Sequence, residues 1–128
     1  MRLLLDTHTF MWWDSASSRL PPAVKALCDD PGNVLLLSVA SLWEIQIKTH
    51  LGKLQLSRPL LEIVTDQQRA NQLQILPVTL EHVAALQSLP AVHRDPFDRL
   101  LVAVAGVEGA TLASGDPVFR QYPVSLVW

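Results

Sequence analysis

Residues 93–105 read His-Arg-Asp-Pro-Phe-Asp-Arg-Leu-Leu-Val-Ala-Val-Ala. Asp95 before Pro96 predicts the start of a helix, because Asp is a favoured N-cap and Pro lacks only an N–H that the first helical position does not use. Residues 100–105 leave no polar face, which is typical of a buried helix. Asp98 then falls in the first turn, where the helix dipole favours a carboxylate. A buried helix therefore carries an acidic residue that needs partners from the rest of the chain.

The composition indicates one compact domain spanning residues 1–128. Of its residues, 49% are hydrophobic and 17% are charged, which argues against disorder. No apolar run approaches the roughly 20 residues of a membrane span, and the apolar N-terminus is too short for a secretory signal. Cys28 is the single cysteine, so no internal disulfide forms. We therefore expect a cytoplasmic protein without a membrane partner.

Short apolar runs alternate with helical patterns along the chain. Strands are expected at residues 3–5, 34–37, 74–78, 111–113 and 124–127. Helices are expected near residues 20–30, 38–50, 59–73 and 79–89 and from residue 95 onward, with shorter turns at 10–13 and after Pro117. This alternation predicts an α/β fold, in which a parallel sheet is covered by helices on both faces.

Four acidic residues follow or precede the predicted strands in a regular way: Asp6, Glu44, Asp98 and Asp116. Ligands of an open α/β sheet bind outside the carboxyl ends of its strands, so we expect all four at that edge. Carboxylates brought close together repel one another unless a cation neutralises them. A hard divalent cation with oxygen ligands, Mg²⁺ or Mn²⁺, suits this set. The pattern predicts hydrolysis of phosphodiester bonds by metal-activated water.

Each acid also has a purely structural interpretation. Asp6, Asp95 and Asp116 can each cap the helix that follows. Asp98 can simply be a first-turn dipole charge. Ser38 or Ser41 can cap the helix near residues 38–50, and with Ser41 as the cap Glu44 can complete a capping box. The Asp-Pro cap fully explains Asp95, which we therefore treat as supporting rather than catalytic.

Four segments together resemble the PIN domain. They are Leu-Leu-Asp-Thr-His at residues 4–8, Ser-Val-Ala-Ser-Leu-Trp-Glu-Ile at 38–45, Asp-Pro-Phe-Asp-Arg-Leu-Leu-Val-Ala at 95–103, and Ser-Gly-Asp-Pro-Val-Phe at 114–119. The resemblance covers essentially the whole chain. Its length and single-domain form are similar to the VapC-type toxins of bacterial toxin–antitoxin modules.

The resemblance implies a three-layer α/β/α sandwich whose parallel sheet has about five strands in the order 3-2-1-4-5. It implies an endoribonuclease that uses Mg²⁺ or Mn²⁺ and carries its acidic quartet at Asp6, Glu44, Asp98 and Asp116. Ser114 stands where the family often has Thr, beside the fourth acid, and would orient a carboxylate or a water on the metal. A cognate antitoxin that covers the site and a toxin homodimer are further implications.

Other residues near these motifs are candidates for supporting roles. Thr7 is a candidate hydrogen-bond donor within the acidic cluster. Contacts with the RNA backbone are candidate roles for the nearby basic residues, which are Lys48, Lys53, His93, Arg94 and Arg99. A solvated face or a surface ion pair explains these basic residues equally simply. Trp12 and Trp13 are candidates for a hydrophobic patch that receives an antitoxin segment.

Other functions fit the sequence less well. A phospho-acceptor receiver domain also clusters acids around Mg²⁺, but it needs adjacent acids after one strand and a Lys near the last. Here Asp6 stands alone and no Lys follows Gln68. A non-catalytic binding module has no reason to keep four mutually repelling acids. A haloacid-dehalogenase phosphatase needs a second Asp where His8 stands, and no Gly-x-Ser-x-Gly motif supports a serine hydrolase.

Overall fold

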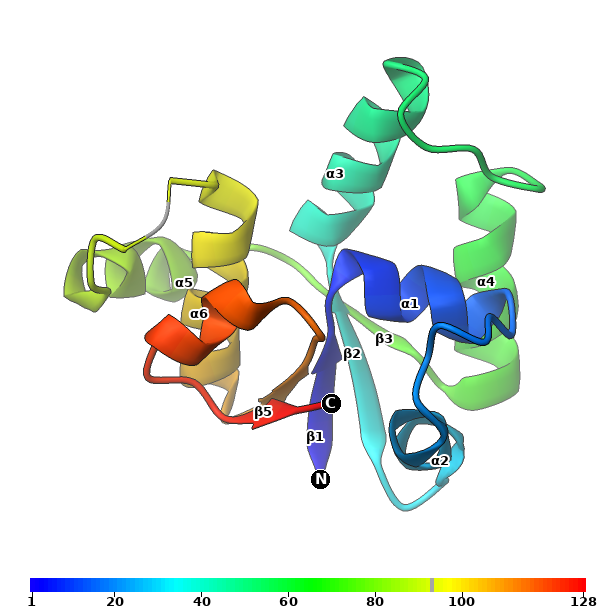
Figure 1. Ribbon diagram of the computed structural model, residues 1–128, viewed down its shortest axis with the longest axis horizontal. Helices are drawn as coiled ribbons and strands as arrows, with labels where there is room; N and C mark the ends of the chain where they lie inside the picture. Colours follow the sequence, from blue (N-terminus) through cyan, green and yellow to red (C-terminus); the bar gives the residue numbers. More distant parts are fainter. Residues whose placement is uncertain (93) are drawn as a thin grey trace.

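The computed structural model describes residues 1–92 and 94–128. Its centre is a parallel sheet with the strand order β3-β2-β1-β4-β5 (Figure 1). The strands are β1 (Arg2–Leu5), β2 (Val34–Ser38), β3 (Gln74–Leu76), β4 (Thr111–Ala113) and β5 (Leu126–Val127). The α/β class and the strand order 3-2-1-4-5 expected from the sequence are confirmed.

Helices cover both faces of this sheet, with α1, α2 and α4 on one side and α5 and α6 on the other (Figure 1). The helices are α1 (Thr7–Asp14), α2 (Pro22–Asp29), α3 (Val39–His50), α4 (Leu60–Asn71), α5 (Leu80–Ala85) and α6 (Pro96–Glu108). Two 3₁₀ helices, η1 (Leu86–Ser88) and η2 (Pro117–Gln121), complete the described elements. Within the described residues, no helix combines the length and the apolar character needed to cross a membrane.

The two edge strands are shorter than the sequence predicts, β3 at its end and β5 at its start. β3 was expected over residues 74–78, but its last residue Leu76 pairs with Ser38, the final residue of β2. β5 was expected over residues 124–127, but it pairs only through Leu126 and Val127 with the end of β4. β3 has β2 as its neighbour in the sheet, so its ladder ends where β2 ends.

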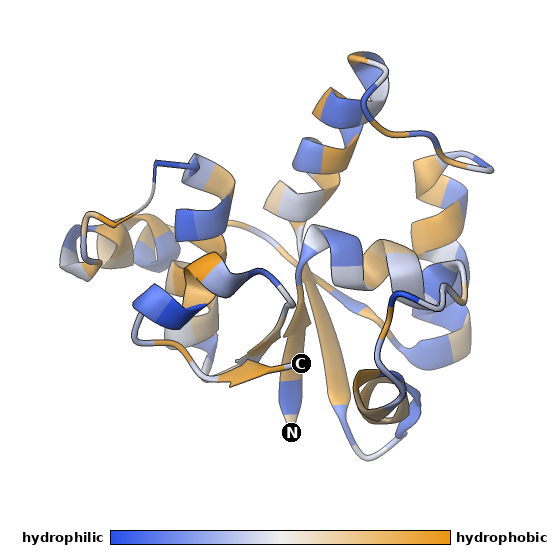
Figure 2. Ribbon diagram, viewed as in Figure 1, coloured by the Kyte–Doolittle hydropathy of each residue, from blue (hydrophilic) through white to orange (hydrophobic). Residues whose placement is uncertain are grey.

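β1 is buried on both of its faces. Leu3 and Leu5 belong to the core formed with α1, α2 and α4, whereas Leu4 belongs to the core formed with α6. All three side chains have no exposed surface. Figure 2 shows the matching hydropathy, with strands that are hydrophobic over most of their length and helices that mix both characters. Alternating side chains of one strand therefore hold both helical layers to the sheet.

α6 runs through the core as expected from its apolar sequence. It begins at Pro96, and residues 101–105 are buried against the sheet. Gly109 ends the helix in the left-handed conformation with φ of 60°, which glycine adopts without steric cost. Gly109 turns the chain from α6 directly into β4, which runs back along the helix. The N-terminus of α6 therefore lies at the carboxyl edge of the sheet.

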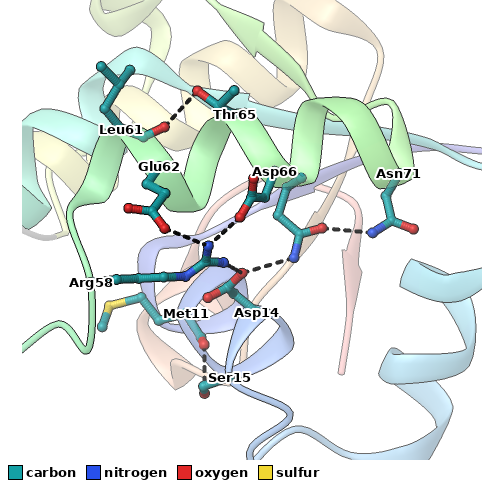
Figure 3. Close-up of polar contacts among 10 residues, drawn as sticks. Met11, Asp14, Ser15, Arg58, Leu61, Glu62, Thr65, Asp66 and Asn71 are labelled. Carbon is teal, nitrogen blue, oxygen red and sulfur yellow. Dashed lines mark hydrogen bonds and ion pairs between the residues drawn. The ribbon is translucent and has the colours of Figure 1, made fainter.

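A polar network fastens α4 to α1 on the outer surface (Figure 3). The Arg58 guanidinium forms ion pairs with Asp66, with Glu62 at 3.6 Å and with Asp14 at 3.7 Å. The Gln67 amide also donates to Asp14, at 2.9 Å. The hydrogen bond to Asp66 raises the pKa of Arg58 above its ordinary value. Asp14 ends α1, so the network joins helices that lie far apart in the sequence.

Replacing Leu4 with Ala removes side-chain contacts from the central strand of the sheet, which packs against both helical layers. We expect the Leu4→Ala variant to lose about 2–5 kcal/mol of unfolding free energy, because a buried cavity adds to the lost transfer energy. Urea denaturation followed by circular dichroism measures the change. The matched control is Leu61→Ala, because Leu61 is 79% exposed and its truncation should stay within about 0.5 kcal/mol. Equal losses in both variants would contradict the central role of β1.

Cys28 makes the free energy of unfolding depend on pH in the alkaline range. Burial in α2, and then the charge of Asp29, raise the pKa of its thiol from 9.0 to about 11. The folded chain therefore holds this proton more tightly than the unfolded chain does. The contribution is complete below pH 9 and is lost as the pH rises toward 11, a change of roughly 2 kcal/mol. We expect urea denaturation to show this slope in the parent chain and a flatter slope in Cys28→Ala.

Candidate active site

An acidic cavity of about 150 Å³ lies at the carboxyl edge of the sheet. Its lining includes all four carboxylates proposed from the sequence: Asp6, Glu44, Asp98 and Asp116. They come from four separate parts of the chain. Asp6 follows β1, Glu44 lies on α3, Asp98 lies on α6 and Asp116 precedes η2. Thr7, Lys48 and Asp95 contribute to the same lining. The fold therefore gathers acids from distant parts of the chain into one concave site.

Asp6 occupies the point where β1 passes into α1. Its Oδ1 accepts a hydrogen bond from the Thr9 amide at 2.8 Å and so caps the helix. The Thr9 hydroxyl donates in turn to the Ala113 carbonyl at 2.9 Å, which ties the start of α1 to the end of β4. This cap extends α1 over Thr7–Asp14, whereas the sequence predicted a turn or short helix only at residues 10–13. Asp6 is therefore held at the start of α1, which is itself hydrogen-bonded to the end of β4.

Glu44 is held by two side chains inside the cavity. The Thr7 hydroxyl donates to Glu44 Oε1 at 2.5 Å, and Lys48 Nζ lies 3.3 Å from Oε2. The first contact places Thr7 within the acidic cluster, as the sequence suggested. The second was missed, although Glu and Lys spaced i, i+4 on a helix were the available signal. The Lys48 ammonium thus brings a positive charge into a cavity lined by carboxylates.

The suggested capping box between Ser41 and Glu44 is wrong. β2 continues to Ser38, so α3 starts one turn earlier and Ser38 is its cap, accepting from the Ala40 amide at 3.1 Å. Ser41 then lies inside the helix, where its buried hydroxyl has no hydrogen-bond partner among the described residues. Glu44 consequently lies in the second turn of α3 and contacts Thr7 and Lys48.

Asp95 and Asp98 both lie at the start of α6. Asp95 Oδ1 accepts from the amides of Phe97 at 2.8 Å and Asp98 at 3.2 Å, which is the N-cap arrangement expected from the Asp-Pro sequence. Asp98 lies in the first helical turn beside this cap and faces the same cavity. The positive end of the α6 dipole is therefore directed at the acidic site.

Asp116 is positioned by its neighbour Ser114. The Ser114 hydroxyl is buried and accepts from the Asp116 amide at 3.1 Å. Asp116 Oδ1 accepts from the Val118 amide at 3.0 Å and starts η2. Ser114 therefore acts on the backbone of Asp116, and the Asp116 carboxylate caps the following turn.

The donor set fits a hydrated hard cation. Among the four candidate ligands, Asp6 and Asp116 each cap a helix through one carboxylate oxygen, and each has a second oxygen. Across residues 1–92 and 94–128, no three His, Cys, Asp or Glu side chains converge closely enough to form a complete ligand cage. Mg²⁺ is usually held by one or two carboxylates and keeps several waters, so it does not need such a cage. The cavity thus offers oxygen donors of the type that Mg²⁺ and Mn²⁺ prefer.

The proposed RNA contacts are spread over different surroundings. Lys48 lines the acidic cavity, whereas Arg99 donates to the Pro90 carbonyl at 2.8 Å and to the Tyr122 hydroxyl at 3.4 Å. Lys53 and Arg94 are exposed, and neither is among the described residues that line the cavity. His93 lies outside the described residues.

Comparisons with known proteins agree with this architecture. The family model of the PIN domain matches residues 3–124, and none of the curated proteins matches the chain by sequence. Three of the solved structures that resemble this chain are described by their TM-score, sequence identity and coverage of each chain. VapBC2 from Rickettsia felis, bound to a DNA fragment from their promoter, has a TM-score of 0.71 and 18% identity, over 99% of this chain and 98% of that chain. DNA-bound VapBC from Salmonella typhimurium has a TM-score of 0.68 and 13% identity, over 99% and 97%. A toxin–antitoxin complex from Klebsiella pneumoniae has a TM-score of 0.64 and 15% identity, over 98% and 96%.

The chain belongs to the PIN-domain family, because the family model covers nearly its whole length. This is a family of nucleases, and the α/β/α architecture with strand order 3-2-1-4-5 agrees with it.

Truncating Asp95 separates its structural role from the chemistry of its neighbours. We expect Asp95→Ala to lose about 0.5–2 kcal/mol of unfolding free energy, because two amides at the start of α6 lose their acceptor. Asp95→Asn keeps a side-chain oxygen at the cap and is the matched control, with a loss of a few tenths of a kcal/mol at most. Urea denaturation measures both variants. Equal stability of Asp95→Ala and the parent chain would show that the cap contributes little.

Proposed function

We propose that the chain is a metal-dependent endoribonuclease and the toxin of a type II toxin–antitoxin module. The observation that carries this proposal is the single cavity lined by Asp6, Glu44, Asp98 and Asp116 at the carboxyl edge of the sheet. Membership of the PIN-domain family supports the nuclease activity. The similarity to toxin–antitoxin complexes supports a cognate antitoxin as the protein partner. A homodimer and a cytoplasmic location complete the proposal.

The four carboxylates are the proposed ligands and catalytic residues. Mg²⁺ or Mn²⁺ held by these carboxylates would supply an activated water and would neutralise the charge that develops during phosphodiester hydrolysis. The chain itself arranges the donors. Thr7 orients Glu44 through its hydroxyl, and Ser114 fixes the backbone that carries Asp116. Asp95 supports Asp98 by accepting from its amide.

Basic side chains near the carboxylates are proposed to attract the RNA backbone. The RNA backbone is a polyanion, and an acidic cavity repels it unless cations lie close by. Lys48 contributes such a charge within the cavity, beside Glu44. Lys53, His93, Arg94 and Arg99 are the further proposed contacts with RNA phosphates.

Asp6→Asn and Asp98→Asn test the carboxylates. We expect each variant to lose at least about 100-fold in RNA cleavage, because the amide replaces an anionic oxygen donor. Asn caps helices as well as Asp does, so Asp6→Asn should keep the α1 cap and the fold. Cleavage of total RNA with Mg²⁺ or Mn²⁺, repeated with EDTA, measures the activity, and circular dichroism checks the fold.

The matched control is Glu81→Gln, which also neutralises one acid in the first turn of a helix. Glu81 is exposed on α5 and is not among the residues lining the acidic cavity. We expect this variant to cleave RNA at the parent rate. Metal-stimulated cleavage retained by both Asp variants, or cleavage indifferent to EDTA, would reject the proposed function.

A further inference from the structure

A second cavity, of about 490 Å³, adjoins the acidic one and differs from it in chemistry. Asp6, His8 and Asp116 line both cavities, and the two carboxylates form part of their common wall. The remaining lining includes Trp12 of α1, together with Arg19 and Trp128. We call this the aromatic cavity. A ligand that reaches the carboxylates can therefore extend directly into a space bounded by rings and a guanidinium.

The rings form a connected group. The Trp12 and Trp128 ring centroids are 5.9 Å apart with the planes tilted by 49°, and His8 and Trp12 are 5.5 Å apart with a tilt of 33°. Arg19 Cζ lies 6.0 Å from the Trp12 ring. Trp128 is 43% exposed, although it belongs to this group. A group of tilted rings that remains partly exposed to solvent offers an aromatic face to one more planar group.

Gly115 fixes the place of Trp128 beside the acids. A Cβ at Gly115 would meet the Trp128 ring at 2.5 Å from Cε2 and 2.6 Å from Nε1, which is closer than real Cβ contacts. The indole therefore packs directly on the backbone between Ser114 and Asp116. This close approach is possible only without a side chain at position 115. The backbone that positions one catalytic candidate thus also positions a ring.

We propose that the aromatic cavity binds a nucleobase of single-stranded RNA next to the phosphodiester held at the acidic cavity, an inference that rests on the proposed function. Unpaired bases stack on aromatic rings and on Arg planes, with about 1–3 kcal/mol per base. Because Asp6 and Asp116 line both cavities, a base in the aromatic cavity would lie next to the phosphodiester bond that is hydrolysed. The aromatic cavity thereby selects unpaired over paired RNA, because a base within a duplex is not free to enter.

The charge of the cavity favours a nucleic acid over a protein segment. A basic peptide attracted by Asp6 and Asp116 would also meet the guanidinium of Arg19 in the same space. A nucleotide instead offers a planar base to the rings and an anionic phosphate to Arg19. Its phosphate at the acidic cavity is tolerated once a divalent cation is bound there.

The test measures binding by chains that do not cleave. The parent is Asp98→Asn, and the probes are a fluorescein-labelled single-stranded RNA decamer of mixed sequence and an abasic decamer with the same number of phosphates. Fluorescence anisotropy with Mg²⁺ gives both affinities. We expect Trp128→Ala in this background to weaken binding of the base-bearing decamer by at least about fivefold and to leave binding of the abasic decamer unchanged. Trp128→Phe, which keeps an aromatic ring, should restore most of the affinity.

Trp43→Ala is the matched control, because Trp43 is 64% exposed on α3 and packs on Phe97 outside the aromatic cavity. We expect its affinity for both decamers to equal that of the parent. Unchanged binding in Trp128→Ala, an equal loss for both decamers, or a parent that binds neither decamer overturns the proposal and leaves the cavity to a protein partner. Cleavage is assayed separately with the native carboxylates. A chain that discriminates between the decamers but never cleaves RNA contradicts only the proposed hydrolase.

Discussion

β1 pairs in parallel with β2 on one side and with β4 on the other, and its leucines are buried in two different cores. Parallel neighbours cannot be joined by tight turns, so the chain must cross over through helices that cover both faces. All strands then end at the same edge. Asp6 after β1, α3 after β2 and Asp116 after β4 are brought together by this single constraint. The acidic cavity is thus a consequence of how the central strand is buried.

The same carboxylates that define the cavity also begin helices. Asp6, Asp95 and Asp116 cap α1, α6 and η2, so backbone amides and helix dipoles present partial positive charge to the acids. These fixed charges offset part of the repulsion among the carboxylates. Structural and chemical interpretations of these residues are therefore compatible, because a cap occupies one oxygen of a carboxylate that has two. The arrangement also keeps each acid rigid, which a metal-binding site requires.

Glu44 and Asp98 lie within helices and cap none, and Glu44 is held by side chains. Thr7 and Lys48 engage its two oxygens, so its position depends on contacts between α1 and α3 as well as on its own helix. On the other side of Asp6 and Asp116, the rings of Trp12 and Trp128 replace charge with planar apolar surface. The edge of the sheet therefore places a cationic side chain, a cluster of acids and an aromatic cavity next to one another.

Local rules sufficed for much of this protein. The alternation of apolar runs and helical patterns predicted the α/β class. The positions of four acids beside the strands predicted that they meet at one edge of the sheet, and resemblance to the PIN domain predicted the strand order. The Asp-Pro cap of α6 was also readable, because capping depends on residues a few positions apart. Long-range contacts decided the rest. β3 ended with its neighbour β2, and Ser38 rather than Ser41 became the cap of α3. Arg99 turned to Pro90 and Tyr122. The meeting of Trp128 with Gly115 likewise arises only on folding, because no periodicity in the sequence records which surfaces the crossovers bring into contact.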